Sequence, residues 1–283
     1  DPIPFLNKVI VPDSEANFNR FESEIIKKIQ NGERILSPQE EKLIIGGEAT
    51  MWTEHVSPET IDSRLWPRTA AIAERLWSPE NIRDVDDMYR RLDIISIQLE
   101  WLGSTHIKNK KMMLRRLART EDINVLENVV DYIEPVKGYK RNNANNFTKY
   151  SPYSLLVDVA APDPSSLRKF NKLLDTLIIN PSDILLEKLY QQLYLWDSNH
   201  DIIQKMAYKN PLLKDLLTHS TSLQVISSRS IELLNLKKKG LAASPEQIKQ
   251  YKDLIKKSLV PAGYCELSLG LNLEKFILDY CQK

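Results

Sequence analysis

The strongest constraint on the fold is the stretch at residues 43–54, which reads Leu-Ile-Ile-Gly-Gly-Glu-Ala-Thr-Met-Trp-Thr-Glu. Its apolar run has the length of a strand and ends at Gly46 and Gly47. This pattern is typical of a buried parallel strand, although periodicity alone does not exclude a buried helix. In a barrel of parallel strands, functional side chains follow the carboxyl ends of the strands. Trp52 and Glu54 occupy that position in the sequence.

Trp52 and Glu54 are two residues apart, so in an extended chain their side chains point to the same side. A flat indole can stack on the apolar face of a sugar, and a carboxylate accepts hydrogen bonds from hydroxyl groups. The pair therefore indicates a carbohydrate site. The alternative is a tryptophan packed in the core beside a solvated glutamate, and this stretch alone does not decide between them. Glu48, in the middle of the expected strand, should face the interior and pair with an arginine.

Two further motifs follow: Arg-Leu-Trp-Pro-Arg at residues 64–68 and Ala-Ala-Ile-Ala-Glu-Arg-Leu-Trp-Ser at residues 70–78. Together with residues 46–56, they resemble glycoside hydrolase family 20, the β-N-acetylhexosaminidases, in their order and spacing. The resemblance covers roughly residues 43–103, with a weaker similarity at the first four residues. It implies that this stretch is the eighth and last strand of a (β/α)8 barrel, followed by the eighth helix.

The same resemblance implies the roles of two residues. Trp52 matches the tryptophan that lines the pocket for the terminal N-acetylhexosamine, and Glu54 matches the carboxylate that hydrogen-bonds hydroxyls of that sugar. Family 20 enzymes use a substrate-assisted retaining mechanism. Their catalytic Asp-Glu pair follows the fourth barrel strand, and no Asp-Glu dipeptide occurs in this sequence. We therefore predict two substrate-binding residues, no catalytic residue, and no activity for the isolated chain.

The predicted fold class is mainly α: the last β/α unit of a (β/α)8 barrel followed by an α-helical bundle domain. Residues 1–107 contain 12 Lys and Arg against 19 Asp and Glu, whereas residues 108–283 contain 27 against 19. This change of charge predicts a domain boundary near His106, which gives domains at residues 1–106 and 107–283. Lysines in the basic half are dispersed, so we do not expect nucleic acid as a partner.

Apolar residues at three- and four-residue steps predict a series of helices. Ser37-Pro38-Gln39-Glu40 and Ser244-Pro245-Glu246-Gln247 are capping boxes that should each start one. A polar stretch at residues 219–222 suggests a break in a long helix, and alternating leucines from Leu267 to Leu273 suggest a strand. The connector at residues 151–164 is expected to hold either a strand or one helical turn. Further helices are expected around Phe18–Ile29, after Pro67, and at Met88–Leu102, Met113–Leu117, Val125–Ile133, Phe170–Leu177 and Leu186–Trp196.

Cys265 and Cys281 are compatible with either a disulfide or two buried thiols. The four histidines form no i,i+4 pair, so we predict no metal site and no cofactor.

We expect no membrane span and see no signal peptide. By resemblance, the full enzyme acts on N-acetylhexosamine-terminated glycans in the periplasm or outside the cell. The sequence leaves open whether the protein forms a homo-oligomer. The alternative function is a non-catalytic helical module that binds protein or glycan.

Overall fold

The computed structural model describes residues 36–138, 140–143, 148, 150, 151 and 153–282, together with residues 24, 27, 28, 31 and 32. The chain forms two compact units, one of residues 1–50 with 72–83 and one of residues 51–71 with 84–283. The expected boundary near His106 falls inside the second unit, and the division into domains 1–106 and 107–283 stays a prediction. The helix expected around Phe18–Ile29 rests on four apolar residues that lie outside the described part of the chain.

The first described helix, α3 (Pro38–Glu41), begins at the predicted capping box. The Ser37 hydroxyl accepts a hydrogen bond from the Glu40 amide, and the Glu40 carboxylate accepts one from the Ser37 amide at 2.8 Å. After this helix, residues 44–53 have no regular secondary structure. The strand expected there is not formed, and Ile45 is 100% exposed. A strand needs a neighbour to pair its amides and carbonyls, and the described residues provide none at this segment.

Glu48 is also placed differently from the prediction. It is exposed, and no ion pair joins it to an arginine within the described residues. The prediction assumed a barrel interior around this carboxylate, where solvation would be lost. The residues on either side of Glu48 are exposed as well, so its carboxylate faces solvent.

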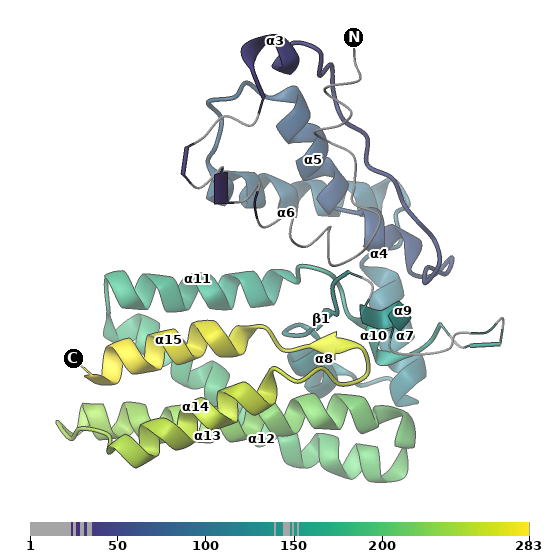
Figure 1. Ribbon diagram of the computed structural model, residues 1–283. Coiled ribbons are helices and arrows are strands. Elements are labelled where there is room, and N and C mark those ends of the chain that lie inside the picture. Colours follow the sequence, from purple (N-terminus) through teal and green to yellow (C-terminus); the bar gives the residue numbers. More distant parts are fainter. Residues whose placement is uncertain are drawn as a thin grey trace. The chain divides into compact units, whose positions relative to one another are not determined.

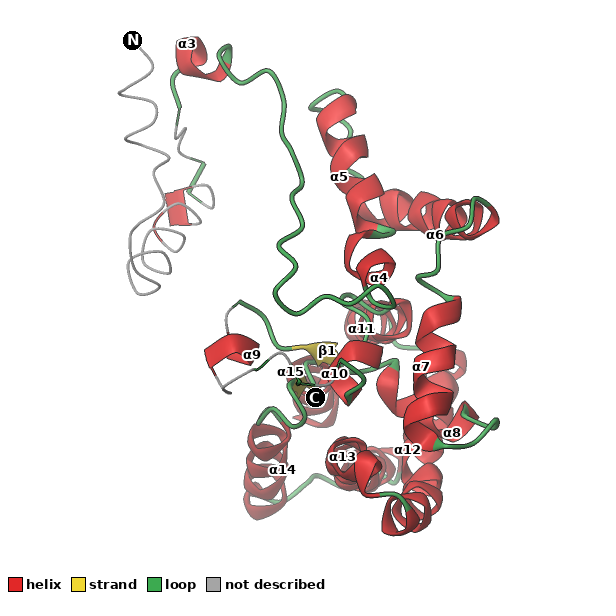
Figure 2. Ribbon diagram, turned by 90° about the vertical axis from the view of Figure 1, so that its right-hand side faces the viewer, coloured by secondary structure: helices red, strands yellow, loops and turns green. Residues whose placement is uncertain are grey.

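The mainly α fold class is confirmed by the second unit, whose helices are shown in Figures 1 and 2. The short strands β1 (Glu134–Pro135) and β2 (Cys265–Glu266) pair antiparallel. Pro67 follows a cis bond from Trp66, and the next helix starts immediately after it. The elements are α4 (Ile61–Leu65), α5 (Arg68–Trp77), α6 (Val85–Trp101), α7 (Lys108–Ala118), α8 (Asn124–Val130), α9 (Lys140–Asn143), α10 (Leu156–Val159), α11 (Ser165–Ile179), α12 (Asp183–Lys209), the 3-10 helix η1 (Pro211–Leu213), α13 (Lys214–Lys238), α14 (Pro245–Ser258) and α15 (Leu269–Gln282). Residues 68–71 of α5 are assigned to the second unit and residues 72–77 to the first.

Helix α13 lies at the centre of the bundle, where it contacts α8, α12, α14 and α15 (Figure 2). Trp196 of α12 is 2% exposed and makes edge-on ring contacts with Tyr132 and Phe170, at centroid distances of 4.8 and 5.0 Å. Burying one large apolar side chain stabilises a fold by about 1.5–3 kcal/mol. The leucine stripes that predicted helices therefore also form this core. Among the described residues, none of the helices combines the length and apolar character needed to cross a membrane.

Two local predictions are corrected or decided by tertiary contacts. The break expected at residues 219–222 is wrong, because α13 is continuous from Lys214 to Lys238. The polar side chains there have partners: His219 Nε2 lies 2.9 Å from the Ala262 carbonyl, and the Ser220 hydroxyl lies 3.1 Å from His200. The leucine alternation ends in a helix, since Leu269 and Leu273 are buried at helical spacing while Leu271 is 56% exposed.

The connector at residues 151–164 contains one helical turn, α10. The second capping box starts α14, as predicted, with the Ser244 hydroxyl accepting from the Gln247 amide. Cys265 and Cys281 are free and buried, which decides between the two alternatives left open by their spacing. Burial raises the pKa of both thiols, so they behave as apolar core residues.

Because the ring of His219 is buried, we expect the free energy of unfolding to fall in acid. Burial lowers the pKa of its ring below the ordinary value, while the hydrogen bond to Ala262 and the Asp215 carboxylate oppose this change. The unfolded chain therefore takes up a proton that the folded chain excludes, so stability is full above about pH 6.5 and falls below it. We expect His219→Gln to reduce the difference in unfolding free energy between two urea titrations, one near neutral pH and one a unit below the ordinary histidine pKa. An unchanged difference would contradict this assignment.

Candidate functional site

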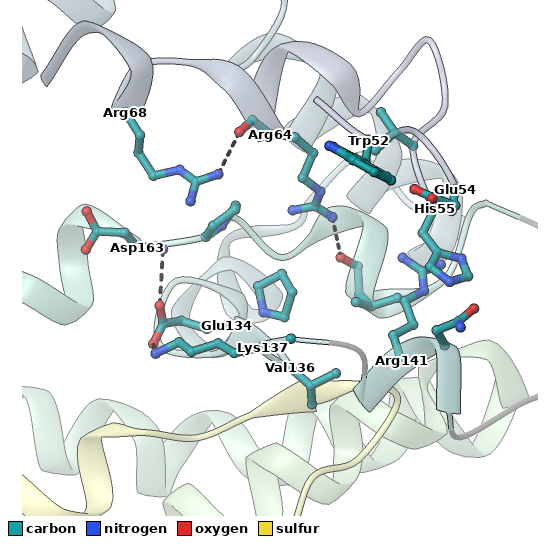
Figure 3. Close-up of a pocket in the computed structure, with 16 residues that line it drawn as sticks. Trp52, Glu54, His55, Arg64, Arg68, Glu134, Val136, Lys137, Arg141 and Asp163 are labelled. Atoms are coloured by element: carbon teal, nitrogen blue, oxygen red, sulfur yellow. Dashed lines mark hydrogen bonds and ion pairs between the residues drawn. The ribbon is translucent and has the colours of Figure 1, made fainter. Parts of the chain in front are cut away.

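The second unit contains a cavity of about 710 Å³ that includes both predicted site residues on its wall (Figure 3). Trp52 and Glu54 reach it from the segment before α4. Both side chains are exposed, and Trp52 is 76% exposed. The complete lining is Trp52, Glu54, His55, Val56, Arg64, Arg68, Glu134, Pro135, Val136, Lys137, Gly138, Arg141, Asn142, Val157, Pro162 and Asp163.

The segment that carries Glu54 is held by contacts with distant parts of the chain. The Tyr153 hydroxyl donates to the Glu54 carbonyl at 2.9 Å. A few residues further on, the Glu59 carboxylate accepts two hydrogen bonds from the Arg116 guanidinium, at 2.6 and 2.8 Å. This bidentate contact holds the pKa of the Glu59 carboxyl below its usual range. The backbone of Glu54 is therefore fixed while its side chain stays available to a ligand.

Arg64 connects α4 to the short helix α10. Its guanidinium donates to the Val157 carbonyl at 2.8 Å and to the Ala160 carbonyl at 3.0 Å. The last carbonyls of a helix have no partner within the helix and carry partial negative charge, so a cation is favourable there. Burial lowers the pKa of Arg64, and the nearby Asp158 carboxylate opposes this change. Arg64 therefore holds α4 against the end of α10.

A buried ion pair lies beneath the cavity. Arg141 Nη1 donates to Asp158 Oδ1 at 2.9 Å, and the two side chains are 9% and 0% exposed. The second oxygen of Asp158 accepts from the Leu155 amide at 2.9 Å. Figure 3 shows Arg141 along the lower side of the cavity, below His55, in the view drawn. The pair joins α9, which carries Arg141, to α10, which carries Asp158.

Sequence reasoning identified Trp52 and Glu54, but it missed Tyr153, Arg141 and Asp158. Those residues lie in or beside loops, where charged and polar side chains are ordinarily solvated, so no periodicity or motif marks them. Their partners are 17 to 99 positions away along the chain. Within the described residues, no group of three or more His, Cys, Asp or Glu side chains is arranged to hold a metal ion.

Comparison with known proteins gives the wider context of this cavity. Residues 12–80 match the family model for the glycosyl hydrolase family 20 catalytic domain. The chain is 50% identical over 58 residues to the beta-hexosaminidase subunit beta of Felis catus, which is 20% of this chain and 11% of that protein. It is 48% identical over 56 residues to the beta-hexosaminidase subunit alpha of Bos taurus, again 20% of this chain and 11% of the relative.

A solved structure resembles a larger part of the chain. The X-ray structure of a Flavobacterium johnsoniae chitobiase matches with a TM-score of 0.77 and 37% sequence identity, over 86% of this chain and 36% of the chitobiase. The chain thus spans about a tenth of the hexosaminidase subunits and about a third of the chitobiase in these matches.

These similarities relate the chain to the glycoside hydrolases. Within that class the similarity is to family 20, the family that the motifs at residues 46–78 resemble.

Proposed function

We propose that this chain supplies part of the substrate pocket of a β-N-acetylhexosaminidase. Trp52 stacks on the terminal N-acetylhexosamine of a glycan, and Glu54 accepts hydrogen bonds from its hydroxyls. The observation that supports this assignment is that both side chains line one cavity and are exposed to it, within a segment of family 20 sequence. The exposed indole face also disfavours the alternative of a tryptophan packed in the core.

The reaction itself is substrate-assisted retention. The acetamido oxygen of the substrate attacks the anomeric carbon, while an acid protonates the leaving oxygen. The sequence contains no Asp-Glu dipeptide to orient the acetamido group and donate that proton. The contribution of this chain is therefore binding that strengthens in the transition state, which raises the rate without a proton transfer of its own. We place the full enzyme in the periplasm or outside the cell, as the family resemblance implies.

We expect the isolated chain of 283 residues to hydrolyse no hexosaminide, because it lacks the Asp-Glu pair. A chromogenic N-acetylglucosaminide incubated with the purified chain should release no chromophore above the buffer rate. The full-length enzyme, assayed beside it, should turn the substrate over. Turnover by the chain in proportion to its concentration would overturn the prediction of inactivity, and an inactive full-length enzyme would overturn the proposed function.

A further inference from the structure

One side of the cavity comes from the part of the chain that was expected to form a separate helical domain. Figure 3 shows Val136 and Lys137 along the lower side of the cavity and Trp52 and Glu54 along the upper side, in the view drawn. Val136 and Lys137 follow β1, and Asn142 of α9 also contributes. We propose that the side of the cavity formed by Val136, Lys137, Arg141 and Asn142, here called the β1–α9 wall, binds the glycan beyond its terminal sugar. Lys137 is its specificity-determining residue. The inference rests on the proposed function.

The β1–α9 wall (Val136, Lys137, Arg141 and Asn142) is held in place by the helical bundle. Val136 donates its amide to the Tyr264 carbonyl at 2.9 Å, and Pro135 lies opposite Cys265 in the β1–β2 pair. Arg141 is fixed by the buried Asp158. A binding wall is most effective when its own conformation is fixed by surrounding contacts. This wall is therefore preorganised, and ligand binding does not have to order it.

The charges around the cavity favour a neutral, hydroxyl-rich ligand. Although several arginines line the cavity, their guanidinium groups make contacts within the protein: Arg64 with two carbonyls, Arg68 with the Arg64 carbonyl at 2.6 Å, and Arg141 with Asp158. Glu134 is likewise engaged, since its two oxygens accept from the Asp163 amide and the Ser268 hydroxyl. A carbonyl does not neutralise a guanidinium, so the charge balance depends on carboxylates. Glu54, Glu134 and Asp163 also line the cavity and Asp158 pairs with Arg141, which leaves no excess of positive charge to select an anion.

Lys137 differs from these groups. Its side chain is 70% exposed, and its ammonium lies 3.8 Å from the Glu134 carboxylate and 3.9 Å from the Glu266 carboxylate. Both distances are longer than a hydrogen bond. The donors of this ammonium can therefore turn to the hydroxyl or acetamido oxygens of a ligand without breaking a short contact.

The size of the cavity agrees with a ligand of more than one sugar. About 710 Å³ lies in the range of roughly 300–1,000 Å³ that is usual for sites enclosing drug-sized ligands. A terminal sugar stacked on Trp52 leaves its neighbour in the glycan to reach the β1–α9 wall. The substrate class that fits is an N-acetylhexosamine oligosaccharide, in which the second unit is also neutral.

The test compares two substrates of the full-length enzyme: a chromogenic N-acetylglucosaminide, which has one sugar, and an N-acetylglucosamine trisaccharide. We expect Lys137→Ala to raise KM for the trisaccharide by about tenfold, because an ionic hydrogen bond is lost, and to leave kcat and both constants for the chromogenic substrate within about twofold. Lys137→Arg should retain most of the trisaccharide KM. The matched control is Lys169→Ala, which removes a 72% exposed lysine of α11 that does not line the cavity.

Two other kinetic outcomes would overturn the inference. Equal losses on both substrates would assign Lys137 a structural role, and unchanged constants would remove it from the site. An equal thermal unfolding midpoint for Lys137→Ala and the wild type separates binding from folding. If the wild-type enzyme hydrolyses neither substrate, the proposed function itself fails, and that result is distinct from a wild type that is active but insensitive to Lys137.

Discussion

Replacing Asp158 by alanine is expected to lower the free energy of unfolding by about 3–5 kcal/mol, because removing one partner leaves a buried charge without compensation. Arg141 is 7% exposed and would keep its positive charge near Arg64, which lines the same cavity. The Leu155 amide would lose its acceptor as well. A loss of this size is a large fraction of the stability of a typical domain, about 5–15 kcal/mol.

Urea titration of the purified chain measures this effect. Lys172→Ala is the matched control, since it breaks an ion pair with Asp86 whose side chains are 63% and 72% exposed, and such a pair contributes about 0–1 kcal/mol. Replacing both Arg141 and Asp158 by apolar residues should recover most of the loss, because no buried charge remains. An Asp158→Ala variant within about 1 kcal/mol of the wild type would show that water reaches the pair.

Glu54→Gln in the full-length enzyme is expected to lower kcat/KM by about one to two decades. Hydrogen bonds to a charged group contribute about 1.5–3 kcal/mol, and each 1.4 kcal/mol corresponds to about tenfold in rate. The amide keeps the size of the carboxyl group but removes its charge and one acceptor. Steady-state kinetics on a chromogenic N-acetylglucosaminide, with initial rates across a range of concentrations, provides both constants.

The matched control for Glu54→Gln is Glu121→Gln, because Glu121 is exposed and does not line the cavity. Its kcat/KM should equal that of the wild type. If Glu54→Gln also leaves kcat/KM unchanged, Glu54 has no role in the substrate pocket and the proposal rests on Trp52 alone. A loss confined to KM would mean that Glu54 binds the ground state and the transition state equally.

Predictions from the sequence were reliable for structures whose interactions join residues a few positions apart. The capping boxes at Ser37 and Ser244 form as expected, since each hydroxyl reaches an amide three residues away. The apolar stripes at Phe170–Leu177 and Leu186–Trp196 also predicted helices, α11 and α12, that contribute to the core. By contrast, the polar stretch at residues 219–222 wrongly suggested a break in the helix. Its hydrogen-bond partners come from α12 and from the turn at Ala262, which are distant in the sequence, so no local pattern reveals them.

The sequence by itself indicated the similarity to family 20, the helical character of the bundle and the two residues proposed to bind the sugar. It could do so because motifs, caps and helical spacing involve neighbours within a few positions. Only the tertiary structure decided what surrounds Trp52 and Glu54: the Tyr153 hydroxyl, the Arg141–Asp158 pair and the wall after β1. It also decided that residues 43–45 form no strand, since a strand depends on a partner that no local pattern can supply.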